Sequence, residues 1–392
     1  MGLCNNPIST KRMEYKPYIL LNIDEFSLTI LPEKGIAIDE WEKYAEKIID
    51  QFVRITQIEK IYDGKVTKMM TEKLEGYDVC YNLGIKDYYF AMAYHSIRAD
   101  MGVCIKYSAK AWAIYQAKYK QLYDENIILP DLLQRINKAI KGVIRLTRID
   151  MTVDYYNYEI DLNDMYEQLK NKSVLVQDDT GRCRIKRTSF QGEDEKIQTL
   201  YVGSKGKGTK GFLRIYNKKI EQIKNNGFRL NDAINCHDWI RYEAVYKGVY
   251  AHAITKELLK NDMDEQEFTC YIAKIITQKY RLFDLLTGEY RKETKDLLNI
   301  ADGSNSGRLR CDSPRDNTLK QSIKYMIFSS GLFSLLYKIE NLFGEEGIRV
   351  FEKYLWGCYT SNIWRSATMT RELNLWLKKH EELAKGCLED NF

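Results

Sequence analysis

Apolar and polar residues alternate with a period of two in three segments, 148–154, 213–216 and 240–244. In each segment the apolar residues occupy one face of an extended strand and the polar residues occupy the other. The sequence therefore predicts three strands, each with a core face and a polar face. The polar faces carry Arg148, Asp150, Thr152, Asp154, Arg214, Tyr216, Arg241 and Glu243.

Strand-like and helical spacings divide the chain into two α+β cycles followed by a helical region. A polar tail over residues 1–16 precedes an N-terminal half at 17–135, and a second half at 136–300 holds the three alternating segments. Residues 301–317 are rich in Gly, Ser, Asp and Asn, which is typical of a linker. Helical periodicity over residues 318–392 predicts a separate C-terminal helical domain.

The two cycles share a short spacing pattern. Gly102–Lys110 reads GVCIKYSAK and Gly211–Lys219 reads GFLRIYNKK, so Gly, Tyr and Lys fall at the same offsets. We infer from this spacing that an α+β module is duplicated within the chain.

Composition excludes several classes of protein. The chain has 392 residues and 44% hydrophobic residues, enough for a folded core. Its nine cysteines form no C-x-x-C pair, which argues against a disulfide framework or a cysteine zinc site and predicts a reducing cytoplasm. The apolar run Tyr325–Tyr337 is too short to span a bilayer, so we expect a buried helix there and no membrane association.

A basic cluster surrounds Tyr216, although the formal net charge of the whole chain is only +5. From 201 to 224 there are seven Lys or Arg residues and one acid, Glu221. Such a cluster suits a phosphate backbone, and a solvated loop is the alternative. The glycine-rich part, 203–211, lacks the G-x-x-x-x-G-K-[ST] pattern of a nucleotide P-loop. The candidate phosphate-binding residues are Arg148, Lys205, Lys207, Lys210, Arg214, Lys218 and Arg241.

Two carboxylates and one tyrosine make a candidate site for cutting DNA. If the three strands are neighbours in one antiparallel sheet, Asp150, Glu243 and Tyr216 converge on one surface. Carboxylates can hold Mg²⁺ or Mn²⁺, which polarises a phosphodiester, and a tyrosine hydroxyl with a pKa of about 10 needs such help to attack. The alternatives are a packed tyrosine and ion-paired acids. The four histidines form no His-x-His motif.

Three stretches together resemble a known family. TRIDMTVDY from Thr147, TLYVGSKGKGTKGFLRIYNKKIEQ from Thr199 and WIRYEAVYKG from Trp239 are similar to the Rep-trans rolling-circle replication initiators and equally to MobT-type relaxases. The resemblance covers about residues 17–300. It implies a duplicated, five-stranded antiparallel sheet with helices, related to the HUH nucleases but without their histidine pair.

The resemblance also implies roles for individual residues. Tyr216 would be the nucleophile that forms a 5′-phosphotyrosine, with Lys219 supporting it or the phosphate. Asp150 and Glu243 would bind the metal, and Asp154 is a weaker candidate. The family's glycine-serine-acid turn is replaced here by GSKGKGTKG, so no role is carried over to that turn.

The expected function is site- and strand-specific DNA nicking and rejoining that initiates rolling-circle replication of a plasmid or mobile element. The alternatives are a relaxase that starts conjugative transfer, a non-catalytic DNA-binding regulator, and a metal nuclease that uses water. The expected partners are the origin duplex and the nicked single strand. The C-terminal helical domain is expected to read duplex DNA, form a homodimer, or contact a helicase or coupling protein. The alternative is a packing domain without a binding function.

Overall fold

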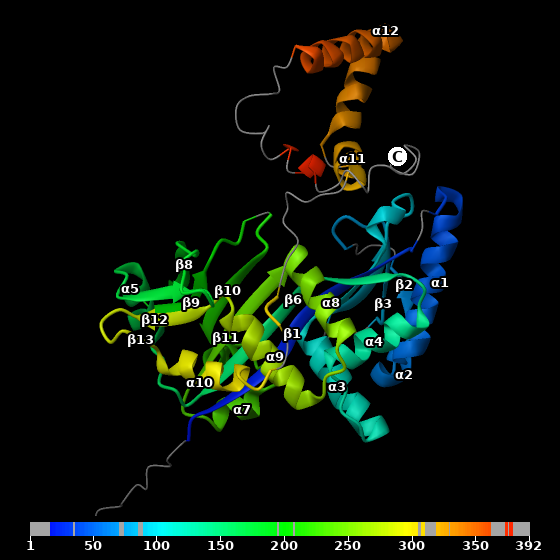
Figure 1. Ribbon diagram of the computed structural model, residues 1–392. Helices are drawn as coiled ribbons and strands as arrows, with labels where there is room; N and C mark the ends of the chain where they lie inside the picture. The colour runs from blue at the N-terminus through cyan, green and yellow to red at the C-terminus, as the bar shows by residue number, and fades with distance from the viewer. Residues whose placement is uncertain are drawn as a thin grey trace, which may run out of the picture. The chain divides into compact units, whose positions relative to one another are not determined.

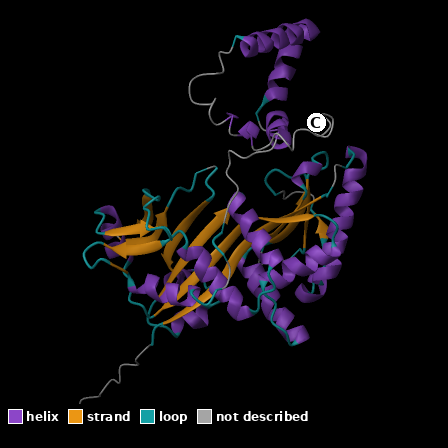
Figure 2. Ribbon diagram, viewed as in Figure 1, coloured by secondary structure: helices purple, strands orange, loops and turns teal. Residues whose placement is uncertain are grey.

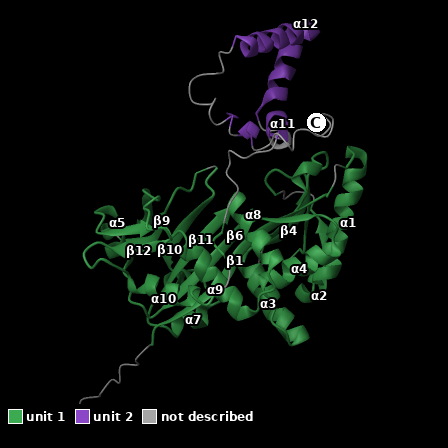
Figure 3. Ribbon diagram, viewed as in Figure 1, with its two compact units in different colours: residues 1–310 green, residues 311–392 purple. Residues whose placement is uncertain are grey.

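The computed structural model resolves two compact units, residues 1–310 and 311–392 (Figure 3). Lys207, one of the predicted phosphate-binding residues, lies outside the described residues. The structure describes residues 16–33, 36–69, 74–84, 89–193, 196–206, 208–304, 307–309, 319–328, 330–361, 373–374 and 376–378.

A ten-stranded antiparallel sheet forms the centre of the first unit (Figures 1 and 2). Its strand order is β2-β3-β4-β5-β1-β6-β11-β10-β9-β8. A separate three-stranded sheet has the order β13-β12-β7. The strands are β1 (Tyr18–Leu31), β2 (Thr67–Lys68), β3 (Val79–Asn82), β4 (Phe90–Tyr94), β5 (Val103–Tyr107), β6 (Val143–Tyr156), β7 (Val174–Gln177), β8 (Thr188–Glu193), β9 (Lys196–Val202), β10 (Gly211–Asn217), β11 (Trp239–Lys247), β12 (Arg281–Asp284) and β13 (Glu289–Tyr290).

The large sheet consists of two five-stranded halves, which confirms the predicted α+β fold with two antiparallel modules. Each half ends in a long strand, β1 or β6, and these two strands pair with each other so that the halves share one sheet. Counting outward from this junction, β5 corresponds to β11 and β4 corresponds to β10. The repeated Gly-Tyr-Lys spacing instead equates β5 with β10. That strand correspondence is wrong, because β5 and β10 occupy different positions in their halves.

Most helices of the first unit cover one face of the large sheet, where the main apolar core lies, and α7 packs on the other face against Tyr156 and Trp239. The helix α8 packs on β6 and β11, α9 packs on β1 and β6, and α3 packs on β1 (Figure 1). The helices of the first unit are α1 (Ile38–Thr56), α2 (Ile58–Tyr62), η1 (Ala99–Met101), α3 (Ala109–Tyr123), α4 (Leu129–Ala139), α5 (Leu162–Lys170), α6 (Lys218–Lys224), α7 (Leu230–Ile234), α8 (Val249–Lys260), α9 (Glu265–Thr277) and α10 (Lys292–Ala301).

The opposite face of β6, which the sequence marks as polar, is also buried. Ile149, Met151 and Val153 join the apolar core, as their alternation predicts. Asp150 and Asp154, on the other face, are just as inaccessible to solvent. A buried charge is stable only when it is paired, so the charged residues of this face must form ion pairs. The candidate site lies among these ion pairs.

The second unit contains α11 (Leu319–Phe328) and α12 (Leu332–Thr360). The non-helical backbone at Gly344, with φ 65° and ψ −164°, marks a kink within α12, and glycine tolerates this conformation. The expectation of one buried helix over Tyr325–Tyr337 is wrong. The run crosses the break between the two helices, and its two end residues are 64% and 68% exposed. Within the described part of the chain, no helix is both long and apolar enough to cross a membrane.

Candidate active site

The three predicted strands are neighbours in the order β6-β11-β10, so their polar faces lie on the same side of one sheet. In one row across the sheet, Asp154 lies opposite Arg241, which lies opposite Tyr216. In the next row, Glu243 lies between Thr152 and Arg214. This register places Tyr216 and Glu243 on one surface.

The end of β10 fixes the position of Tyr216. Asn217 follows it and caps α6, because its side-chain oxygen accepts a hydrogen bond of 2.9 Å from the backbone N–H of Ile220. At the start of the strand, Gly211 passes so close to β11 that a Cβ there would lie 2.7 Å from the carbonyl oxygen of Val245. Tyr216 is thus the last residue of β10 before Asn217, which ends the strand and caps the helix.

The Tyr216 hydroxyl donates a hydrogen bond of 3.2 Å to Oε2 of Glu243. The same carboxylate accepts two contacts of 2.6 Å from one terminal nitrogen of Arg214, whose guanidinium lies 4.9 Å from the centre of the Tyr216 ring. Burial, and next the charge of Glu243, hold the pKa of Tyr216 well above its ordinary value. The neutral hydroxyl is therefore the stable form of this tyrosine in the DNA-free protein.

Asp150 lies on the same face and is held by Arg148. Two hydrogen bonds of 2.9 and 2.6 Å join the guanidinium to the two oxygens of this carboxylate. Arg148 also contacts Glu25 of β1 at 2.8 Å. Burial raises the pKa of Asp150 to about 7, the hydrogen bond from Arg148 opposes this rise, and the charge of Glu243 adds to it.

Asp154 belongs to a separate and more deeply buried ion-pair group. Arg241 donates hydrogen bonds of 2.6 and 2.8 Å to its two oxygens, and Arg229 donates another of 3.0 Å. Arg241 also reaches Asp24 at 2.7 Å. Burial alone would raise the pKa of Asp154, but the charge and hydrogen bonds of Arg241 lead the effects that lower it below its ordinary value. The geometry gives Asp154 a structural role.

The predicted lysines are placed differently from one another. Lys218, not Lys219, lies beside the candidate nucleophile, with its ammonium 5.6 Å from the Tyr216 ring and 2.8 Å from Glu221. The ammonium of Lys219 is held by the backbone carbonyl oxygens of residues 236 and 237, at 2.8 and 3.0 Å. Lys205 lies over the ring of Tyr201, whereas Lys210 lines a groove of about 490 Å³ beyond the start of β10.

The predicted arginines differ in exposure. The side chains of Arg148 and Arg214 are 30% and 36% exposed, so a phosphate can reach them. Arg241 is only 4% exposed and is engaged by two carboxylates, so it is not a surface phosphate contact.

Sequence reasoning missed four residues of this face: Asp24, Glu25, Glu221 and Arg229. The first two come from β1, which pairs with β6 from more than a hundred residues away in the chain. The alternation of Glu25, Phe26 and Ser27 indicates a strand there, but not which strand lies beside it.

A metal ion does not fit these side chains as they are arranged. Carboxylate oxygens are suitable donors for Mg²⁺ or Mn²⁺. However, guanidinium groups already hold Asp150 and Glu243. Among the described residues, moreover, no group of three or more His, Cys, Asp or Glu could hold a metal ion. The use of a metal therefore stays a prediction from the sequence.

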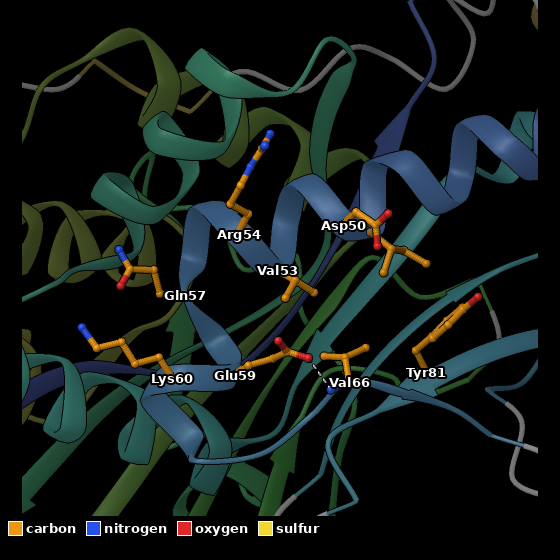
Figure 4. Close-up of a pocket in the computed structure, with 9 residues that line it drawn as sticks. Asp50, Val53, Arg54, Gln57, Glu59, Lys60, Val66 and Tyr81 are labelled. Atoms are coloured by element: carbon orange, nitrogen blue, oxygen red, sulfur yellow. Dashed lines mark hydrogen bonds between the residues drawn. The ribbon is translucent and has the colours of Figure 1, made fainter.

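A groove of about 710 Å³ opens beside Tyr216, between β9, the start of α5, and α6. Its polar lining includes Asn163, Gln198, Thr199, Asn217 and Glu221. A second cavity of about 500 Å³ lies in the other half of the sheet, between α1, α2 and β3, and is lined by side chains of both charges (Figure 4). Of the predicted site residues that the structure describes, none lines this second cavity, so the groove beside Tyr216 is the better candidate for a substrate.

Comparison with known proteins supports the family suggested by the sequence. Residues 144–331 match the Rep_trans family, described as replication initiation factor, and this span contains the site residues of β6, β10 and β11. A solved structure of a rolling circle replication initiator protein from Geobacillus stearothermophilus aligns with a TM-score of 0.47 and 13% identity. That alignment covers 74% of this chain and 99% of the other. No curated protein matches this sequence. The family match by itself confirms the Rep-trans resemblance over residues 144–331.

Proposed function

Because residues 144–331 match the Rep_trans replication initiation factors, we propose that this protein initiates DNA replication by cutting one strand at a specific site. The cut would proceed through a 5′-phosphotyrosine and start rolling-circle replication of a plasmid or mobile element. The observation that carries the proposal is the hydrogen bond from the Tyr216 hydroxyl to Glu243, which is also paired with Arg214. This arrangement joins a nucleophile and a cation of β10 to a proton acceptor of the neighbouring strand β11.

In the proposed step, the hydroxyl oxygen of Tyr216 attacks the phosphorus of a phosphodiester. A bond forms between this oxygen and phosphorus, and the bond from phosphorus to the 3′-oxygen breaks. The tyrosine proton passes to Glu243, and the departing 3′-oxygen takes up a proton from water to become a 3′-hydroxyl that can prime synthesis. One phosphodiester replaces another, so the reverse attack by a 3′-hydroxyl rejoins the strand without an external energy source.

The raised pKa of Tyr216 determines when the proton leaves. Since the free phenolate is unfavourable in the buried site, deprotonation must accompany the attack, and Glu243 lies within hydrogen-bonding distance to accept the proton. Arg214 can offset the charge that develops on the phosphate oxygens.

Several finer expectations belong to this proposal. Dependence on Mg²⁺ or Mn²⁺ is one of them, and a cytoplasmic location is another. Contacts of the second unit with a homodimer partner, a helicase or a coupling protein also remain proposals. A relaxase that starts conjugative transfer would use the same chemistry at Tyr216.

Trapping a covalent adduct tests the proposal. The protein is incubated with single-stranded oligonucleotides that tile the DNA flanking its gene, with Mg²⁺ or Mn²⁺ present, and adducts are mapped by mass spectrometry. Wild type is expected to carry the 5′-phosphate end on Tyr216, and Tyr216→Phe is expected to form no adduct. Tyr166→Phe, in α5, is the matched control and should react as wild type does. An adduct of undiminished yield in the Tyr216→Phe protein would show that another residue is the nucleophile.

A further inference from the structure

A small aromatic and basic surface lies on the same sheet face as Tyr216, further along β10. It consists of Tyr201, Lys205, Phe212 and Lys247, and we refer to it as the Phe212 patch. The Phe212 and Tyr201 ring centres are 6.3 Å apart, and the two planes are inclined by 53°. The Lys247 ammonium lies 5.9 Å from the Phe212 ring, and that of Lys205 lies 3.5 Å from the Tyr201 ring. Three neighbouring segments thus supply two rings and two cations to one surface.

Strand register explains why this patch and Tyr216 share a face. Phe212 precedes Tyr216 by four residues in one strand, so both side chains point the same way, about 13 Å apart along the strand. Tyr201 lies opposite Arg214, and Phe212 lies opposite Val245, which is two residues before Lys247. The patch is therefore a continuation of the candidate active site along the sheet.

A glycine allows the chain to fold back over the patch. Gly203 has φ +106°, a conformation that other residues rarely adopt, and a Cβ there would lie 3.3 Å from the Cβ of Phe212. The turn that begins at Gly203 brings the Lys205 side chain back over Tyr201. The glycine-rich loop, whose role the family resemblance left open, thus brings a cation to an aromatic surface.

The patch differs from the active site in its charge balance. Around Tyr216, arginines are neutralised by buried carboxylates. Neither Lys205 nor Lys247 forms an ion pair with a carboxylate of the described residues. Phe212 is half-buried, so part of its ring remains accessible to a flat partner. Accessible aromatic surface next to unneutralised cations is typical of sites that bind single-stranded nucleic acid.

We propose that Phe212 stacks on a base of single-stranded DNA while Lys205 and Lys247 contact the adjacent phosphates. The Tyr201 ring packs beside that of Phe212 in a tilted arrangement. The patch holds the strand that runs along β10 to Tyr216 and thereby positions the scissile phosphate. This inference rests on the proposed nicking function, because it names the residues that bring the same substrate to the nucleophile.

Binding measurements with a fluorescein-labelled oligothymidylate test the role of the ring. Fluorescence anisotropy of wild type, Phe212→Ala and Phe212→Leu is compared, and Phe212→Leu retains an apolar side chain without a ring. Both variants are expected to bind about 5- to 100-fold more weakly, the range for the loss of one stacking ring. The matched control is Phe190→Ala, which removes a ring that is 50% exposed and packs on Tyr166 of α5. It should bind as wild type does.

The salt dependence of binding tests the two lysines. Each phosphate contact contributes about 0.7 to the slope of log affinity against log salt for a single strand. The double variant Lys205→Gln and Lys247→Gln is therefore expected to lower this slope by about 1.4. Lys138→Gln, an exposed lysine at the end of α4, should leave the slope unchanged.

Two results would overturn the inference. One is wild-type affinity in both Phe212 variants when their circular dichroism and melting are native. The other is an equal loss of affinity for duplex and single-stranded DNA in these variants, which would exclude base stacking. Failure of the nicking proposal gives a different result, since it removes the Tyr216 adduct whether or not the patch binds DNA.

Discussion

The buried pair of Asp154 and Arg241 predicts a large effect of Asp154→Ala on stability. The side chains of Asp154 and Arg241 are 2% and 4% exposed, and two hydrogen bonds of 2.6 and 2.8 Å join them. The substitution leaves the guanidinium of Arg241 buried with one carboxylate partner in place of two, because Asp24 still contacts it at 2.7 Å. Removal of one partner from a buried pair typically costs about 3–5 kcal/mol. The remaining contact to Asp24 favours the lower end, about 3 kcal/mol.

The assay is urea denaturation of wild type and variant at neutral pH. Because the pKa of Asp154 is lowered in the folded protein, its contribution is fully present at neutral pH and is lost only as pH falls through that lowered value. Asp232→Ala is the matched control. It removes another carboxylate that contacts Arg229 at 2.7 Å, but its side chain is 47% exposed. A surface pair of this kind should cost at most about 1 kcal/mol.

The same variant separates a structural role from metal binding. We expect Mn²⁺ binding to the folded Asp154→Ala protein, measured by electron paramagnetic resonance, to match that of wild type. A variant that unfolds at the wild-type urea concentration but has lost Mn²⁺ binding would refute the structural assignment and restore Asp154 as a metal ligand.

Two further predictions concern the other carboxylates. The pKa of Asp150 in the folded protein, about 7, lies above its ordinary value of 3.8, so its stabilising contribution is present at low pH and is lost as pH rises through about 7. The free energy of unfolding of wild type should therefore fall between about pH 4 and about pH 7. Asp150→Asn should flatten this fall, as measured by urea titrations at several pH values between those two, and an unchanged slope would contradict the raised pKa. Arg214→Gln removes the guanidinium that holds both oxygens of Glu243, so DNA-free protein should bind Mn²⁺ more tightly in paramagnetic resonance titrations. Equal affinities would show that the guanidinium does not compete with a metal ion.

Much of the sheet face was predictable because a strand has a period of two. Alternation alone assigned Asp150, Glu243 and Tyr216 to polar faces, and the adjacency of their strands was the only added assumption. The burial of those faces was not predictable. The arginines of those faces are paired with Asp24 and Glu25 of β1, which pairs with β6 across the junction of the two halves, and Ala233 of α7 packs against Tyr156 and Trp239.

The choice between Lys218 and Lys219 shows a different limit. The helix begins directly after Asn217, and consecutive residues of a helix point in directions about 100° apart. Only the first lysine therefore lies beside Tyr216, while the second turns toward the carbonyl groups near His237. Where a strand is followed directly by a helix, the directions of the first helical side chains depend on which residue caps the helix. The sequence pattern alone does not identify that residue.

The pairing of Arg214 with Glu243 has a consequence for the order of events at the site. In the DNA-free protein the guanidinium of Arg214 engages both oxygens of this carboxylate. A phosphate that attracts Arg214 weakens this pairing and leaves Glu243 hydrogen-bonded to the Tyr216 hydroxyl. When DNA binds, Arg214 then exchanges Glu243 for a phosphate, and the same exchange leaves Glu243 available to accept the Tyr216 proton. A site without DNA therefore does not hold an activated nucleophile.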